Sequence, residues 1–178
     1  ANTNRSPVVV SSSNQSDAEG DTVSVAVSGS DPDGNGLTWS ATGLPGGVSI
    51  DSGSGVISGT LSYTSSGVHS VTVRATDDGS PSLFDVVAFS WSVANTNRQP
   101  VVVSPGNQSD AENGSISLPI SGYDPDLNTL TWTATGLPPN LVIDPATGTI
   151  SGTLSYTSAG THSVTVRATD DGSPVLFA

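Results

Sequence analysis

The chain has 178 residues and a formal net charge of −12, from 4 basic and 16 acidic residues, which argues against binding the phosphates of nucleic acid. It has no cysteine, which excludes disulfides, and nothing near the roughly 18 consecutive apolar residues that a membrane-spanning helix needs. Its 20 Gly and 12 Pro instead suit an all-β protein with many turns.

The first half of the chain is a series of short segments in which apolar and polar residues alternate. In residues 22–28, for example, Val23, Val25 and Val27 share one face, because side chains alternate sides along a strand. The expected strands are, in chain order, residues 8–10, 22–28, 37–41, 48–50, 56–58, 71–76 and 85–93. About seven strands with turn residues between them are typical of an immunoglobulin-like sandwich, and no segment has a helical apolar period.

The same series then recurs with a constant offset. Trp39 returns as Trp132, and the segment that begins at Thr76 returns at Thr169, so the offset is 93 in both cases (132 − 39, 169 − 76). A period of this size is a whole small domain, since solenoid repeats span about 20–50 residues. We therefore expect a slice of a tandem array with two domains, residues 1–94 and 95–178.

The second copy is shorter than the first. Ala178 corresponds to Asp85, so the second copy has no counterpart of the strand at residues 85–93. The expected fold is therefore all-β, with two tandem immunoglobulin/cadherin-like β-sandwich domains joined end to end, the second lacking its last strand. An unpaired strand edge is a template for another chain, so we expect the second copy to be less stable or to accept a strand from another molecule.

The acidic residues gather in short loops. Asp31 and Asp33 flank a proline, as do Asp124 and Asp126, so a tight loop can aim both carboxylates at one point. One interpretation is a plain turn, because Asp, Pro, Gly and Asn are turn residues. The other is a calcium site, since calcium takes six to eight oxygen ligands. The second copy keeps both acids of the loop but not its glycines, which favours the metal.

Several motifs in order identify a family resemblance. The first copy has Gly43-Leu44-Pro45, Gly55-Val56-Ile57-Ser58-Gly59-Thr60 and Val71-Thr72-Val73-Arg74-Ala75-Thr76-Asp77-Asp78-Gly79, and the second repeats them with Ile143-Asp144-Pro145-Ala146-Thr147-Gly148. These segments resemble the cadherin-like modules of bacterial surface proteins, specifically the dystroglycan-type cadherin-like and He_PIG group. The resemblance covers essentially all of both copies.

Modules of the cadherin type bind calcium between successive domains, and the resemblance implies specific ligands. Those at the junction are Glu19, Asn95, Asn97, Asp124, Asp126 and Asp170. Those of a half site at the start of the chain are Asn2, Asn4, Asp31, Asp33 and Asp77. The acidic Asp-Arg-Glu segment of the family is absent, because residues 61–65 take its place, and the linker's own Asp is Thr96. We therefore expect one or two calcium ions per junction.

Other functional residues are scarce. His69 and His162 are expected to face inward, packed and hydrogen-bonded, and the three Trp residues are expected in the cores, which leaves few aromatic rings to stack on sugars. There is no Gly-x-Ser-x-Gly motif, so we expect neither catalytic residues nor an organic cofactor.

The leading hypothesis is a calcium-binding structural or adhesion module of a secreted or membrane-associated bacterial surface protein, located extracellularly or at the cell surface. Its partners would be proteins, in homophilic or heterophilic contacts, or a polysaccharide. The alternative is a carbohydrate- or matrix-binding accessory domain of an extracellular enzyme.

Overall fold

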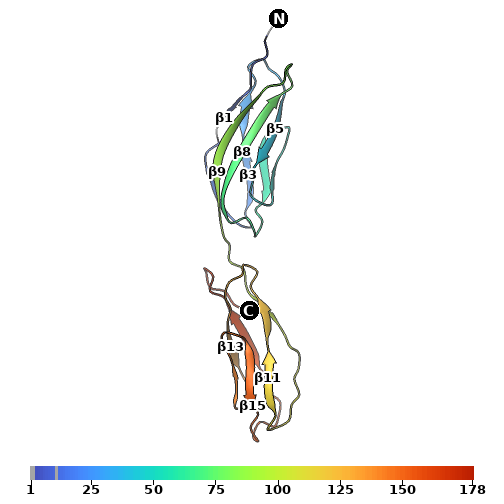
Figure 1. Ribbon diagram of the computed structural model, residues 1–178, viewed down its shortest axis with the longest axis vertical. Coiled ribbons are helices and arrows are strands. Elements are labelled where there is room, and N and C mark those ends of the chain that lie inside the picture. The colour runs from blue at the N-terminus through green and yellow to red at the C-terminus, as the bar shows by residue number, and fades with distance from the viewer. Residues whose placement is uncertain (1–2, 11) are drawn as a thin grey trace. The chain divides into compact units, whose positions relative to one another are not determined.

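The computed structural model describes residues 3–10 and 12–178, and all regular structure in these residues is β-strand (Figure 1). The chain divides into two compact units, Ala1–Thr96 and Asn97–Ala178, called unit 1 and unit 2 below. The boundary predicted from the sequence, between residues 94 and 95, lies just before this division. Within the described part of the chain, no helix is long and apolar enough to cross a membrane.

Unit 1 is a sandwich of strands that run in two main sheets. Its strands are β1 (Val8–Val10), β2 (Gln15–Ala18), β3 (Thr22–Ala26), β4 (Ser28–Ser30), β5 (Leu37–Thr42), β6 (Val48–Ile50), β7 (Val56–Thr60), β8 (Gly67–Asp77) and β9 (Phe84–Ala94). One sheet has the order β2-β9-β8-β5 and the other has the order β3-β7-β6, while β1 and β4 form a small third sheet. All the strands expected from alternation in this copy are present.

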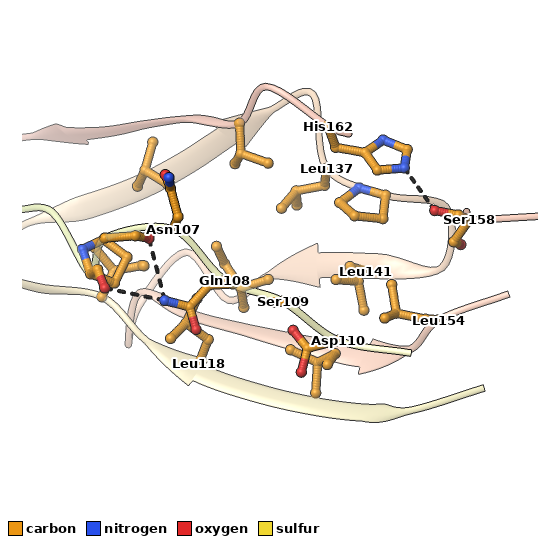
Figure 2. A pocket seen from close by; sticks show the side chains of 18 of the residues that line it. Asn107, Gln108, Ser109, Asp110, Leu118, Leu137, Leu141, Leu154, Ser158 and His162 are labelled. Carbon is orange, nitrogen blue, oxygen red and sulfur yellow. Dashed lines mark hydrogen bonds between the residues drawn. The ribbon is translucent and has the colours of Figure 1, made fainter. Parts of the chain in front are cut away.

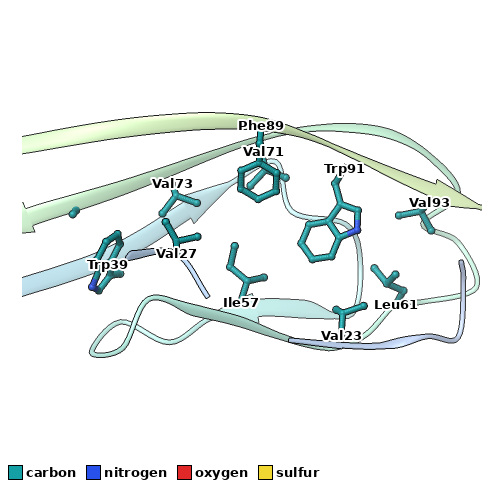
Figure 3. Packing of buried hydrophobic residues seen from close by; sticks show 11 residues of the cluster. Val23, Val27, Trp39, Ile57, Leu61, Val71, Val73, Phe89, Trp91 and Val93 are labelled. Atoms are coloured by element: carbon teal, nitrogen blue, oxygen red, sulfur yellow. The ribbon is translucent and has the colours of Figure 1, made fainter. Parts of the chain in front are cut away.

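The core of unit 1 lies between the two main sheets (Figure 3). β8 and β9 are antiparallel, with Val71 opposite Phe89 and Val73 opposite Val87, so these residues share the inner face. Trp91 follows on the same face of β9 and is completely buried. Figure 3 shows it above Leu61 and Val23, so β9 closes one side of the core. Apolar burial of this kind is the dominant stabilising term of a small domain.

Two strands of unit 1 were not predicted from the sequence. β2 has the polar sequence Gln-Ser-Asp-Ala and runs parallel to β9, with Gln15 opposite Trp91. β4 contains Gly29, and a Cβ at this position would lie 2.7 Å from the carbonyl oxygen of Val8 and 3.0 Å from the ring of Trp39. Both strands depend on neighbours distant in sequence, so local alternation does not predict them.

Unit 2 repeats this plan with fewer strands. Its strands are β10 (Val101–Val103), β11 (Ser115–Pro119), β12 (Ser121–Tyr123), β13 (Thr131–Thr135), β14 (Leu141–Ile143), β15 (Thr149–Thr153) and β16 (Thr165–Thr169). The sheets are β11-β15-β14, β13-β16 and β10-β12. The described residues of unit 2 include no counterpart of β2 or β9, apart from a single bridge between Thr169 and Phe177. The predicted fold class, all-β with two tandem sandwich domains, is confirmed.

Equivalent residues of the two units differ in burial near β8 and β16. Val71 of unit 1 is completely buried, but Val164, at the equivalent position, is 39% exposed. His162 is exposed as well, although its ring nitrogen still lies 3.0 Å from the carbonyl oxygen of Ser158. The expectation that His162 is packed is therefore wrong for the described residues of unit 2, although its expected hydrogen bond is present. In unit 1, His69 is half-buried and contacts Ser65 in the same way.

Candidate metal centre

The Asp124 loop of unit 2 is held by its own backbone. β12 ends just before Asp124, and the N–H of Leu127 donates to the carbonyl oxygen of Asp124 to close a turn. The Oδ1 atom of Asp124 accepts hydrogen bonds from the N–H groups of Asp126 and Asn128, at 2.8 and 3.2 Å. Such turns are the usual role of an Asp at this position. The second carboxylate oxygen of this buried residue makes no hydrogen bond in the turn.

Asp126 is engaged by an arginine that the sequence analysis did not single out. Its Oδ1 accepts from Nε and Nη2 of Arg98, at 2.8 and 2.6 Å, and its Oδ2 accepts from the backbone N–H of Arg98. These bonds from Arg98 hold the pKa of Asp126 below its ordinary value, although partial burial acts in the opposite direction. Arg98 therefore neutralises one of the predicted metal ligands. In unit 1, Arg5 binds Asp33 in the same way.

Asp170 and Asn97 form a second contact at the end of β16. Oδ1 of Asp170 accepts from the N–H groups of Gly172 and Leu176, and Oδ2 accepts from Nδ2 of Asn97 at 3.1 Å. Nδ2 of Asn97 also donates to the carbonyl oxygen of Pro174. Both donor hydrogens of this amide are used, so its oxygen is directed away from Asp170 and is available as a ligand.

Several buried oxygen atoms near these loops have no hydrogen-bond partner. In unit 2 they are Oδ2 of Asp124, Oδ1 of Asn97 and Oδ1 of Asn128. In unit 1 the same atom of the equivalent acid, Oδ2 of Asp31, also has no partner. Leaving a buried acceptor unpaired costs free energy, so such atoms require an explanation. Carboxylate and amide oxygens of this kind are ligands that calcium accepts.

Acidic side chains alone do not build this centre. Within residues 3–10 and 12–178, no three His, Cys, Asp or Glu side chains gather closely enough to hold a metal ion. A metal site among these residues would therefore need neutral oxygens, from amides or backbone carbonyls, as well as carboxylates. This donor set of neutral and anionic oxygens suits calcium, which accepts all of these ligand types.

The half site in unit 1 has the same construction. Nδ2 of Asn4 donates to Asp77 at 3.0 Å and to the carbonyl oxygen of Pro81 at 2.9 Å. Oδ1 of Asp31 accepts from the N–H of Asp33 at 2.7 Å. Burial acts to raise the pKa of Asp77, but hydrogen bonds from the Leu83 N–H and from Asn4 outweigh it and the net shift is downward. Asn2, the remaining predicted ligand, lies outside the described residues.

The other predicted ligands, Glu19 and Asn95, belong to unit 1. Glu19 is only 3% exposed, and its two carboxylate oxygens accept from the N–H groups of Ser66 and Thr96, at 2.9 and 3.2 Å. The hydroxyl of Thr96 donates to the carbonyl oxygen of Glu19 as well. Glu19 thus joins the turn before β8 to the segment after β9, while Asn95 is exposed. The carboxylate of Glu19 already has a structural role.

Two groups that the sequence analysis missed carry a signal in the repeat itself. Arg98 stands 93 residues after Arg5, and Asn128 stands 93 residues after Asn35 (98 − 5, 128 − 35). Each recurs beside a predicted ligand. For the ion pair, the available signal was that Arg98 recurs next to the predicted ligand Asn97. For the additional amide oxygen, the signal was that Asn128 recurs in the acidic loop.

Comparison with known proteins gives a consistent result. The profile of the family described as "Putative Ig domain" (He_PIG) matches residues 6–94 and 99–174. A protein of Staphylococcus aureus named "Serine-rich adhesin for platelets" is 36% identical over 159 residues, which is 88% of this chain but 7% of the relative. The same protein from another strain is 38% identical over 135 residues, which is 75% of this chain and 10% of the relative. The chain therefore spans a tenth or less of these relatives.

Solved structures of animal cadherins share the fold. Mouse cadherin-23 EC22-24 superposes with a TM-score of 0.59 at 23% identity, covering 99% of this chain and 64% of that one. Human CDH23 EC21-23 superposes with a TM-score of 0.61 at 21% identity, covering 97% and 62%. The predicted resemblance to bacterial cadherin-like modules is confirmed, as is the extracellular or cell-surface location, by relatives that are bacterial adhesins.

Proposed function

Because the chain belongs to the Putative Ig domain family, with bacterial adhesins among its relatives, we propose that it is a pair of calcium-binding modules with a structural and adhesive role in a bacterial surface protein. The observation that carries the metal is the partnerless carboxylate oxygen at the same position of both units, in Asp31 and Asp124. An internal repeat that leaves the same buried oxygen unpaired twice supports a common ligand.

The proposed ion in unit 2 binds Oδ2 of Asp124 together with the amide oxygens of Asn97 and Asn128. Asp170 orients Asn97 through the hydrogen bond to its Nδ2 atom. Asp126 contributes little charge, because Arg98 already balances it. A site with few uncompensated carboxylates binds calcium weakly, so we place its dissociation constant at about 0.1–1 mM, the range of extracellular modules.

The proposed role of the ion is to fix the loops at one end of each unit. Without a cation, the buried oxygen of Asp124 lies unpaired, and binding of an ion shifts the folding equilibrium by linkage. At a calcium concentration 100-fold above the dissociation constant, the gain is about 2.7 kcal/mol. A tandem array of modules with ordered ends is a suitable spacer, and the proposed partners are proteins, in homophilic or heterophilic contacts. We propose no enzymatic activity.

Calorimetric titration with calcium, and thermal melting with and without chelator, test this proposal. The informative variant is Asp124→Asn, which keeps an oxygen for the N–H groups of the turn but replaces the unpaired oxygen with an amide nitrogen. It should abolish binding to unit 2 and leave unit 1 unchanged, and Asp31→Asn should do the reverse. Asp144→Asn is the matched control, because Asp144 lies in another turn of unit 2. No heat at millimolar calcium in the unmodified chain would refute the proposal.

A carbohydrate- or matrix-binding role is the second candidate, and it has less support. All three Trp residues are buried, as predicted, so none of them offers a flat exposed ring. The most exposed aromatic residues are tyrosines, with Tyr156 at 75% and Tyr123 at 59% exposure. Retention of the chain on immobilised polysaccharides, lost on replacing Tyr156 with Ala, would favour this role.

A further inference from the structure

Two Asn-Gly pairs occur in the chain, Asn35-Gly36 in unit 1 and Asn113-Gly114 in unit 2. An Asn before Gly can lose its side-chain amide, because the backbone nitrogen of the Gly attacks the side-chain carbonyl carbon of the Asn. Glycine has no Cβ, so nothing obstructs this close approach. The reaction needs both groups to be free to move, and the two pairs differ in this respect.

Asp78 restrains both reacting groups of the first pair. Its Oδ1 atom accepts hydrogen bonds from Nδ2 of Asn35 at 3.3 Å and from the backbone N–H of Gly36 at 2.9 Å. Asn35 is half-buried, and its own N–H donates to Asp31 at 3.3 Å. The attacking nitrogen and the leaving amide are therefore tied to one carboxylate oxygen, and ring closure would have to break both bonds.

The side chain of Asn113 is not restrained in this way. The residue is exposed and, within residues 3–10 and 12–178, its side chain makes no hydrogen bond. The N–H of Gly114 donates to the carbonyl oxygen of Ala111 at 3.0 Å, which closes a single turn at the surface. Such a turn opens locally at a lower cost in free energy than a core strand. Both reacting groups of this pair are therefore accessible.

The turn at Asn113 belongs to the repeat, because unit 1 has the same turn with Gly20 at the equivalent position (113 − 20 = 93). The N–H of Gly20 donates to the carbonyl oxygen of Leu61 and that of Asn113 to Leu154, both at 2.9 Å. Figure 2 shows the side chain of Leu154, which follows β15 directly, among the apolar residues of unit 2. The φ angles of Gly20 and Asn113 are +84° and +62°, in the left-handed region that favours glycine. Unit 2 thus has a reactive Asn in a turn whose geometry suits Gly.

We propose that Asn113 is a site of spontaneous deamidation in the folded chain and that Asn35 is protected from it. The N–H of Gly114 first loses its proton to hydroxide. Its nitrogen then attacks Cγ of Asn113, a bond forms between these two atoms, and the bond from Cγ to Nδ2 breaks. Nδ2 takes a proton from water and leaves as ammonia, which restores the hydroxide. Water then opens the succinimide ring at either carbonyl carbon, so the product at position 113 is aspartate or isoaspartate.

The three Asp-Gly pairs of the chain react through the same ring, but their side chains are restrained. Asp33 accepts from Nε of Arg5 at 3.0 Å, and Asp171 accepts from the N–H of Thr129 at 2.8 Å. Asp78 accepts the two bonds described above. An ionised carboxylate also repels the deprotonated nitrogen that would attack it, whereas an amide is neutral. The side chain at position 113 is therefore the most reactive of the five.

Both products change unit 2. Each adds one negative charge to a chain whose net charge is already −12. Isoaspartate also adds a carbon atom to the backbone between two hydrogen bonds to Leu154. One is donated by the N–H of Asn113 at 2.9 Å, and the other is donated by Leu154 to the carbonyl oxygen of Gly114 at 3.0 Å. These two bonds cannot both keep their spacing, so ageing of the chain should lower the melting temperature of unit 2.

Peptide mapping by mass spectrometry tests the proposal on the full chain, incubated in mildly alkaline buffer below its melting temperature. We expect Asn113 to lose its amide at least about tenfold faster than Asn35, because freeing Asn35 requires breaking hydrogen bonds to a charged acceptor. In denaturant neither pair is restrained, so the two rates should be similar. Equal rates in the folded chain would overturn the inference. So would an unmodified Asn113 after a time that suffices for both pairs in denaturant.

Variants of Asp78 test the protection of Asn35. Asp78→Ala removes the acceptor and should raise the rate at Asn35 towards that at Asn113, which serves as the internal control in the same molecule. Asp78→Ser keeps an oxygen acceptor without the charge and should raise the rate less. A rate at Asn35 that neither change alters would refute the protective role.

Asn113→Gly provides the matched control, because Gly is the residue that unit 1 has in this turn. The variant should show neither the modification in unit 2 nor the fall in melting temperature on ageing. An equal fall in this variant would show that ageing does not act through Asn113 and would contradict the assigned consequence.

Discussion

At the scale of single residues, the two acids of the Asp-Pro-Asp loop have different tasks. Asp126 is bound by Arg98 through backbone and side chain, whereas Asp124 holds the turn with one oxygen and leaves the other unpaired. The sequence predicted both as ligands of one ion, on equal terms. The structure instead pairs Asp126 with Arg98 and leaves one oxygen of Asp124 without a partner, so the proposed ligand is Asp124.

Replacing Arg98 with Ala tests the role of this ion pair. The side chain of Asp126 is 4% exposed, so the variant leaves a buried carboxylate without its partner and should destabilise unit 2 at pH 7 by about 1–3 kcal/mol. The pair lowers the pKa of Asp126, so its contribution is present above the unfolded pKa of about 3.9 and is lost as the pH falls through the lower folded pKa. In denaturant titrations from pH 7 to pH 2, the difference in the free energy of unfolding between variant and parent should therefore decrease at acid pH.

Arg5 provides the matched control for this measurement. It makes the same contacts to Asp33, but its side chain is 59% exposed, against 31% for Arg98. Exposed ion pairs contribute little, so Arg5→Ala should have a smaller effect. Equal losses of unfolding free energy in the two variants would contradict this account. So would a stability difference between the Arg98→Ala variant and the parent that stays constant down to pH 2.

Asp124→Asn should change stability in opposite directions with and without calcium. In the presence of chelator, the variant removes an unpaired buried carboxylate oxygen and should melt at the same temperature as the parent or above it. In saturating calcium, the parent gains the linkage energy and the variant does not, so the order reverses. Thermal melts with chelator and with calcium measure these melting temperatures. If calcium raised the melting temperatures of parent and variant equally, Asp124 would be excluded as the ligand.

At the scale of elements, β9 contributes most to the difference between the units. It places Phe89, Trp91 and Val93 in the core of unit 1 and pairs with β8 on one side and β2 on the other. β2 is recognised as a strand only through this pairing, because three of its four residues are polar and they show no apolar alternation. Its place depends on contacts such as the one between Asn14 and the backbone of Ser90.

Trp91→Ala should destabilise unit 1 by about 3–5 kcal/mol, the cost of removing a fully buried aromatic side chain. Phe84→Ala lies on the same strand but on its outer face, where the ring is 52% exposed beneath the guanidinium of Arg74. This control should cost at most about 1 kcal/mol. Urea denaturation that monitors the unfolding of unit 1 distinguishes the two variants. Comparable losses of unfolding free energy would mean that β9 does not close the core.

At the scale of the whole molecule, two copies of one sequence pattern differ in how much core they bury. The cluster of buried apolar residues in unit 1 contains Phe89, Trp91 and Val93 of β9, whereas that of unit 2 consists of Ile120, Trp132, Ile150 and Ala168. Each fully buried large side chain contributes about 1.5–3 kcal/mol, so this difference is comparable to the stability of a small domain.

We therefore expect two unfolding transitions in calorimetry, with unit 2 unfolding first. Replacing Trp132 with Phe assigns them, because the remaining Trp residues then report only on unit 1. The fluorescence change of this variant should follow the upper transition. A single transition with equal calorimetric and van't Hoff enthalpies would show that the units unfold together.

The sequence by itself determined the repeat, the strands with alternating residues and the sandwich fold. These features are local, since strand alternation and turn residues are properties of neighbouring positions, and the repeat is a comparison of the chain with itself. The acidic loops were located for the same reason.

Only the tertiary structure decided which partner each polar group has. Asp126 meets Arg98 from 28 positions away, and Glu19 meets the N–H of Thr96 from 77 positions away. Hydrogen bonds and burial depend on positions in space, and the packing of the sheets determines these positions. A pattern along the chain therefore identifies candidate ligands, but it does not show which oxygens remain unpaired.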